Sequence, residues 1–144
     1  MYDNQKWLEE AKEYYTGWYL KIERLDKQLT YLFPDYKIGQ IKEKFGTLRF
    51  YADFSAEDEV KQSIAYSLIA AVESSTYSTC IVCGNYGKMR DQGWVRVLCD
   101  DHYQVVLDKV TRNCKHVWVS KAGAEYRENP VEVCTKCLLE KKEE

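Results

Sequence analysis

Every cysteine and histidine of the chain falls into one of four close pairs, and this pattern constrains the fold more than any other feature. The pairs are Cys80 with Cys83, Cys99 with His102, Cys114 with His116, and Cys134 with Cys137. Thiolates and imidazoles two or three positions apart can bind the same ion without distorting the backbone, and four such ligands form a tetrahedral zinc site. The eight ligands therefore predict two structural zinc ions per chain, each held by three Cys and one His.

The segment between the second and third pairs indicates which pairs share an ion. Residues 103–113 predict a helix of about three turns, roughly 16 Å long, whereas the cross-braced sites of RING domains have only a few residues there. Sequential pairing is therefore favoured, with the first two pairs on one ion and the last two on the other. A disulfide framework is the alternative use of the cysteines. The charged N-terminus does not resemble a signal peptide, and a cytosolic chain would keep its thiols reduced.

The spacing around the ligands predicts two small zinc modules. Residues 80–84 have the form of a zinc knuckle, a tight turn whose glycine takes a backbone conformation that other residues resist. A hairpin through Met89 and Trp94 then leads to Cys99 and His102 at the start of a helix, an order that predicts a treble-clef finger over residues 80–113. Residues 114–144 predict a zinc ribbon. Modules of this size rarely fold without their metal.

The first 79 residues predict a helix–hairpin–helix unit, so the whole chain is expected to be α+β. Apolar residues recur every three or four positions over residues 4–33, which predicts one long amphipathic helix ended by Pro34. Alternation over residues 36–53 predicts a β-hairpin with its turn near residues 44–46. Ser55 and Asp58 predict a capping box for a helix over residues 56–77. Its buried face is expected to carry Val60, Ile64, Leu68, Ala71 and Val72.

Motifs in the hairpin and the first finger resemble those of a known group. Residues 41–51 read IKEKFGTLRFY, and a helix, a CxxCG motif, a Gly-Trp pair and an LCxxH motif follow up to His102. In these features residues 36–103 resemble small, uncharacterised zinc-finger proteins encoded by bacteriophages and prophages. The resemblance implies a phage origin and a place in the host bacterial cytoplasm, and it implies no particular chemistry.

The sequence lacks the residue patterns of common catalytic sites. Four protein ligands fill the coordination sphere of each predicted zinc ion, whereas a catalytic zinc ion keeps one coordination position open. With both histidines expected on zinc, none is left as the base of a nucleophilic cysteine or of a His–metal nuclease. The H-x-E of zinc deaminases, the GxxxxGK[ST] loop and the GxGxxG loop are all missing from the sequence. We therefore expect a protein that is not an enzyme.

Charge and composition favour a binding role. The formal net charge is −2, and two zinc ions with six thiolates would take it to about −4, which argues against coating nucleic acid by bulk charge. No apolar run approaches the roughly 20 residues that span a bilayer. We expect the partner to be a host protein or nucleoprotein complex. One example is a bacterial anti-phage defence system, which this chain would inhibit as an anti-CRISPR protein does. The expected contact residues are Tyr15, Tyr19 and Leu20 on the first helix.

Nucleic-acid binding is the alternative function. Lys42, Lys44, Arg49 and Tyr51 cluster on the hairpin, and Lys88, Arg90 and Arg96 lie around the first finger. Cationic and aromatic side chains together can clamp and stack a single strand, although an ordinary solvated face would have the same composition. The wide apolar stripe of the first helix is also compatible with a homodimer.

Overall fold

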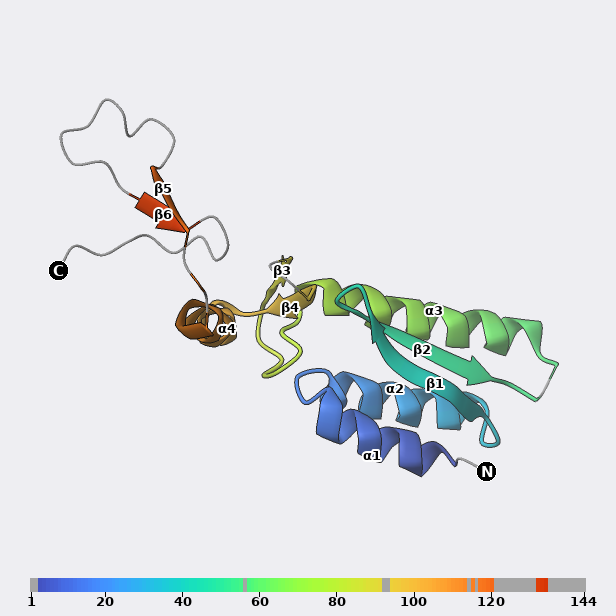
Figure 1. Cartoon of the computed structure of the whole chain (residues 1–144). Coiled ribbons are helices and arrows are strands. Elements are labelled where there is room, and N and C mark those ends of the chain that lie inside the picture. The colour runs from blue at the N-terminus through green and yellow to red at the C-terminus, as the bar shows by residue number, and fades with distance from the viewer. Residues whose placement is uncertain are drawn as a thin grey trace. The chain divides into compact units, whose positions relative to one another are not determined.

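The computed structural model describes residues 3–55, 57–91, 94–113, 115, 117–120 and 132–134. The fold is α+β, as predicted, and the chain divides into two compact units, Met1–Asp100 and Asp101–Glu144 (Figure 1). The finer domain boundaries at residues 79/80 and 113/114 remain predictions. Among the helices in the described part of the chain, none combines the length and the apolarity that a bilayer-spanning segment requires.

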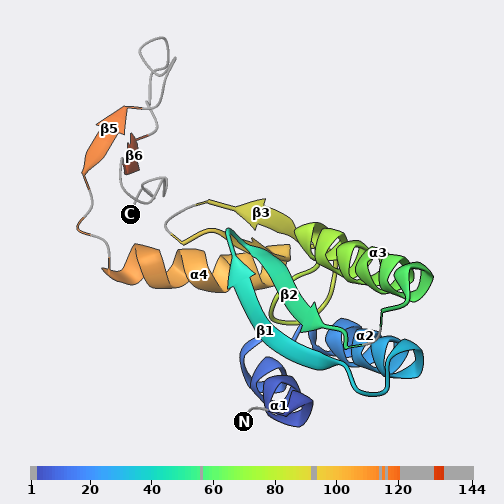
Figure 2. The ribbon, with the colours of Figure 1, turned by 90° about the vertical axis from the view of Figure 1, so that its right-hand side faces the viewer.

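The described elements are short helices and two-stranded sheets. Their order is α1 (Asn4–Tyr14), α2 (Tyr19–Leu32), β1 (Lys37–Lys44), β2 (Thr47–Asp53), α3 (Glu59–Ser75), the 3-10 turn η1 (Thr76–Ser78), β3 (Lys88–Arg90), β4 (Arg96–Leu98), α4 (Asp100–Asn113), β5 (Trp118–Ser120) and β6 (Glu132–Cys134). Each sheet is one antiparallel pair, β1–β2, β3–β4 or β5–β6. In the first unit α1 contacts β1 and α2, while α3 contacts β2 and α2 (Figure 2).

The predicted hairpin is confirmed as β1 and β2. A two-residue turn at Phe45 (φ 53°) and Gly46 (φ 87°) joins the strands, and positive φ at both positions matches the right-handed twist of a hairpin. One face of the hairpin is buried and carries Ile38, Ile41, Leu48 and Phe50. These side chains form one core cluster with the inward faces of the three helices of this unit.

Helix side chains, rather than further strands, cover the edges of this hairpin. On the β2 edge the Leu48 N–H donates to Thr76 Oγ1 at 3.0 Å, and the Phe50 N–H donates to Glu73 Oε2 at 2.9 Å. On the β1 edge the Ile38 N–H donates to Asn4 Oδ1 at 2.7 Å. An unpaired strand edge can pair with another chain. These contacts therefore protect both edges of the β1–β2 sheet without a further strand.

The single long helix predicted over residues 4–33 is wrong. The chain forms α1 and α2, separated by a turn over residues 15–18. Trp18 in this turn is fully buried, and its Nε1 donates to the Thr79 carbonyl at 3.1 Å. The apolar period continues through the turn because both helices pack on the same core, so the period alone could not reveal the break.

The predicted start and buried face of the third helix also need correction. The helix begins at Glu59, and the side chain of Asp58 caps it by accepting from the Lys61 N–H, so Ser55 is not the cap. The buried residues are Ala65 and Ile69, with Leu68 and Val72 partly buried. Val60 and Ile64 are 71% and 46% exposed, and Ala71 is exposed too. Both faces of α3 are apolar, and the bonds from Glu73 and Thr76 to β2 select the one that turns inward.

We expect Glu73→Ala to lower the free energy of unfolding by about 1–3 kcal/mol, because it leaves the Phe50 N–H without its acceptor. Urea denaturation followed by circular dichroism measures this loss. Glu59→Ala, an exposed position on the same helix, is the matched control. Equal losses in the two variants would contradict a role for Glu73 in covering the β2 edge.

Candidate metal centre

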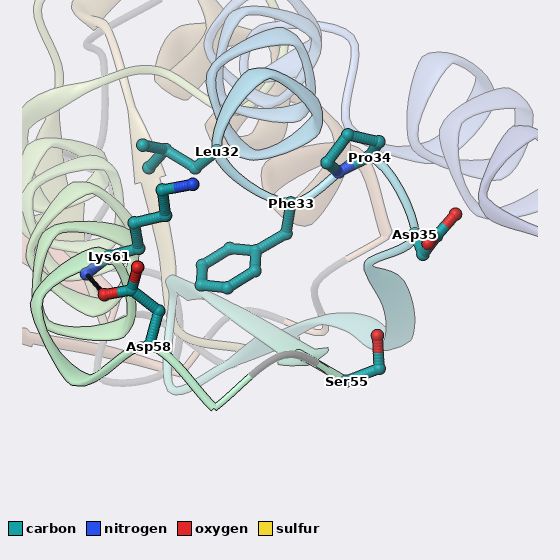
Figure 3. A pocket seen from close by; sticks show the side chains of 7 residues that line it. All are labelled: Leu32, Phe33, Pro34, Asp35, Ser55, Asp58 and Lys61. Atoms are coloured by element: carbon teal, nitrogen blue, oxygen red, sulfur yellow. Dashed lines mark hydrogen bonds between the residues drawn. The ribbon is translucent and has the colours of Figure 1, made fainter.

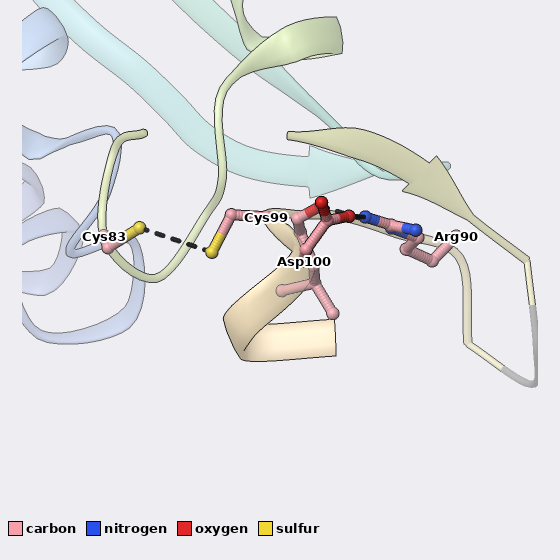
Figure 4. Close-up of polar contacts among 5 residues, drawn as sticks. Cys83, Arg90, Cys99 and Asp100 are labelled. Carbon is pink, nitrogen blue, oxygen red and sulfur yellow. Dashed lines mark hydrogen bonds and ion pairs between the residues drawn. The ribbon is translucent and has the colours of Figure 1, made fainter. Parts of the chain in front are cut away.

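The structure brings the first predicted ligand set together. One ligand atom from each of Cys80, Cys83, Cys99 and His102 lies within 4.8 Å of all the others, a cluster that could hold a metal ion. The Sγ atoms of Cys83 and Cys99 are 3.7 Å apart (Figure 4). Thiolates bound at about 2.3 Å to a tetrahedral ion stand about 3.8 Å apart, whereas a disulfide needs about 2.05 Å. The spacing is that of a shared ion.

Two loops and a helix start supply these ligands. Cys80 and Cys83 lie in the loop after η1, Cys99 directly follows β4, and His102 lies in the first turn of α4. The first loop is closed by the Gly84 N–H, which donates to the Cys80 carbonyl at 2.9 Å. Gly84 has φ +82°, a conformation available to glycine at little cost. The tight glycine turn predicted for residues 80–84 is therefore present, and this turn is called the knuckle below.

Backbone N–H groups of the loop point at the sulfur atoms. Burial raises the pKa of the Cys80 thiol, but hydrogen bonds from the backbone of Cys99, Cys83 and Val82 outweigh it and lower the pKa to about 7. The Asn85 backbone lowers the pKa of Cys83, while burial and the two neighbouring thiols raise it above its usual value. Such outer contacts orient metal ligands before the ion arrives.

Arg90 of β3 contacts the residues on both sides of Cys99. Arg90 Nη2 lies 2.7 Å from Asp100 Oδ1, and Arg90 Nε donates to the Leu98 carbonyl at 3.2 Å (Figure 4). The guanidinium holds the pKa of Asp100 below its usual value. Because Asp100 is exposed, the pair contributes little free energy.

The knuckle rests directly on the turn between α1 and α2. The Gly17 N–H donates to the Ile81 carbonyl at 2.7 Å, and Thr16 Oγ1 donates to the Val82 carbonyl at 2.6 Å. A Cβ atom at Gly17 would lie 2.0 Å from the Cys80 carbonyl oxygen. Only glycine fits this contact. Sequence reasoning missed it, and the one signal available was a glycine inside a helical pattern.

The second predicted ligand set is placed only in part. Cys134 ends β6, where it pairs with Trp118 of β5. Cys114, His116 and Cys137 lie outside the described residues. The second ion therefore remains a prediction.

The hairpin residues proposed for partner contact share the face that points away from the core. Lys42 and Arg49 are direct cross-strand neighbours, and Lys42 Nζ lies 5.6 Å from the centre of the Tyr51 ring. Lys44 and Tyr51 are exposed, while Arg49 is half-buried and donates to Thr47 Oγ1 at 3.0 Å. The four residues form one surface, called the hairpin face below.

The helix residues proposed for partner contact are mostly used inside the fold. Tyr15 stacks on Trp18 with ring centres 5.6 Å apart, and its hydroxyl accepts from the Glu43 backbone on the β1 edge. Burial is the main cause that raises the pKa of Tyr15. Tyr19 is half-buried and packs on the core cluster. Only Leu20 of the three is exposed.

A shallow pocket lies between the end of α2 and the start of α3. Its lining is Leu32, Phe33, Pro34, Asp35, Ser55, Asp58 and Lys61 (Figure 3). Asp58 is already committed to capping α3, and the cysteine and histidine ligands do not line this pocket. The pocket is therefore separate from the candidate metal cluster.

No protein family model matches this sequence, and neither the curated proteins nor the solved structures contain a match to it. Functional inference therefore rests on the residues themselves.

We expect Gly17→Ala to weaken zinc binding and lower the free energy of unfolding by about 3 kcal/mol, although no ligand is altered, because the new methyl group overlaps the Cys80 carbonyl. Competition with a chelator and denaturation measure the two effects. Gly39→Ala is the control, since its Cβ would meet its nearest neighbour at 3.7 Å. Unchanged zinc affinity in Gly17→Ala would show that the knuckle folds independently of the helices.

Proposed function

We propose that each chain binds two structural zinc ions. The donor set of three thiols and one imidazole in the Cys80–His102 cluster is one that zinc prefers, and its four ligands leave no open position. The order of knuckle, β3–β4 hairpin and α4 supports a treble-clef finger. The pairing of β5 with β6 at Cys134 supports a zinc ribbon that holds the second ion.

Native mass spectrometry of the purified chain should detect two zinc ions. Cys83→Ser and Cys134→Ser should each lower the count by one, and Cys83→Ser should also destabilise the first unit, because lost metal binding is lost folding free energy. One ion in the wild-type chain would refute the second site. If the Cys83→Ser variant binds as many zinc ions as the wild-type chain, the first site is refuted.

We infer that the chain acts by binding rather than by catalysis. The first cluster offers four protein ligands for one ion, and Asp58 at the described pocket caps α3. The resemblance to phage-encoded zinc-finger proteins supports only the origin and the location of the chain, since it implies no particular chemistry. The proposed role is that of a phage accessory protein in the bacterial cytoplasm.

The hairpin face favours single-stranded nucleic acid as the partner. It sets Lys42, Lys44 and Arg49 beside the exposed ring of Tyr51 on strands that bury their other face. Cations two positions apart on a strand stand about 7 Å apart, and they can follow a phosphate backbone while the ring stacks on a base. This juxtaposition of charge and ring carries the proposal.

Fluorescence anisotropy with labelled single-stranded oligonucleotides tests this function. Three cations predict a slope of log affinity against log salt of about −2, which is roughly a 20-fold loss between 50 and 200 mM salt. Tyr51→Ala should weaken binding about 5- to 150-fold through lost stacking. Arg24→Ala removes an exposed charge from α2 and should change little. No binding at low salt would refute the proposal.

A host protein complex, such as a defence system that the chain would inhibit, is the second candidate. Large aromatic side chains of the kind that dominate protein interfaces are exposed at Tyr31, Tyr86 and Trp94. A stoichiometric complex with a host protein, together with no affinity for oligonucleotides, would favour this candidate.

A further inference from the structure

The turn between β1 and β2 carries a large aromatic residue at a position where the backbone favours small ones. Among the described residues, Phe45 is the non-glycine residue with a positive φ, 53°. Bulky side chains rarely adopt this conformation, and hairpin turns of this kind favour Asn, Asp or Gly at this position. The Phe45 side chain is 73% exposed and lies outside the core cluster. The fold therefore gains little from a ring that strains its own turn.

The turn that carries this ring is held in place from several sides. The Gly46 N–H donates to the Glu43 carboxylate, and Thr47 Oγ1 donates to the Lys44 carbonyl at 3.2 Å. The turn also lies against the β3–β4 hairpin, where a Cβ atom at Gly46 would be 2.7 Å from Met89 Sδ (Figures 1 and 2). An exposed ring on such a preorganised turn loses little conformational freedom when a partner binds it.

The same arrangement of a cation beside a ring occurs twice along β1. Lys42 Nζ lies 5.6 Å from the centre of the Tyr51 ring, and Lys44 Nζ lies 5.6 Å from the centre of the Phe45 ring. Lys42 and Lys44 are two positions apart on the strand, so their side chains leave it on the same face. The Phe45 ring therefore lies beside the hairpin face, at the end where the strands turn.

The charges near the ring fit a polyanion. Lys42 directly opposes Arg49 across the two strands, a repulsive pairing that an anion bound between them would relieve. Lys44 is exposed beside the ring, while the acidic residue at this end of the hairpin, Glu43, is engaged by the turn. Single-stranded nucleic acid offers both a negative charge and a flat apolar ring at every repeat. It is therefore the partner that this alternation of cations and rings fits.

We propose that Phe45 is a second base-stacking platform, so that one single strand places bases on the rings of Tyr51 and Phe45 while Lys42 and Lys44 contact its phosphates. The strained backbone of Phe45 is then explained by binding, because functional sites retain such conformations where they present a side chain to a partner. The inference rests on the proposed nucleic-acid function and adds to it a residue that the hairpin face does not include.

Phe45→Asn separates binding from folding, because Asn-Gly is a preferred pair for this turn. In the zinc-loaded full chain, this variant should unfold at an equal or higher urea concentration than wild type. Its affinity for labelled oligothymidylate of about 12 nucleotides should fall about 5- to 150-fold in fluorescence anisotropy. The slope of log affinity against log salt should not change, because a stacking contact is lost and no cation is.

Two control variants accompany this measurement. Phe45→Tyr keeps an aromatic ring at the turn and should bind like wild type. Tyr31→Asn makes the same kind of change at another exposed ring, on α2, and should leave the affinity for the oligonucleotide unchanged.

The proposal is overturned if a folded Phe45→Asn variant binds like wild type while Tyr51→Ala does not, a result that would leave the proposed nucleic-acid function standing. A loss of affinity that Tyr31→Asn shares, or one that accompanies a lower urea midpoint in Phe45→Asn, would be equally contrary, since neither is specific to stacking on this ring. A wild-type chain that binds no oligonucleotide at low salt would refute the function itself and this inference with it.

Discussion

The contact between Gly17 and the knuckle is the constraint on which the rest of the first unit depends. The knuckle carbonyls of Ile81 and Val82 accept hydrogen bonds from the turn between α1 and α2, and the absence of a side chain at Gly17 lets the two backbones meet. This contact breaks a helical pattern that would otherwise continue. It also buries Trp18 against Thr79, so the helical core and the metal loop fold as one body.

The hairpin and α3 extend this coupling from the other side. Glu73 and Thr76 bond to the β2 edge, and the chain leads on through η1 to Thr79 and Cys80. The bonds that close the sheet edge thus also set the position from which the knuckle starts. A metal ion bound at the Cys80–His102 cluster and the packed core would therefore stabilise each other.

The features that local pattern determines were predictable from the sequence. The hairpin follows from period-two alternation, and the first ligand set follows from the spacing of its pairs. The break between α1 and α2 at Gly17 could not be predicted, because the residues that contact this turn lie more than 60 positions further along the chain. Which face of α3 is buried could not be predicted either. Both of its faces carry apolar residues, and the hydrogen bond from β2 to Glu73 accompanies the burial of one of them. Tyr15 was expected at the surface, yet its hydroxyl meets the Glu43 backbone.

Most of the polar chemistry of the first unit serves the fold, and this shapes what the chain can do. The Cys80–His102 cluster could hold one ion, and Asn4, Glu73 and Trp18 satisfy backbone groups of other elements. The hairpin face is the surface that these contacts leave over: its three cations lie beside the ring of Tyr51, on strands whose other face is buried in the core.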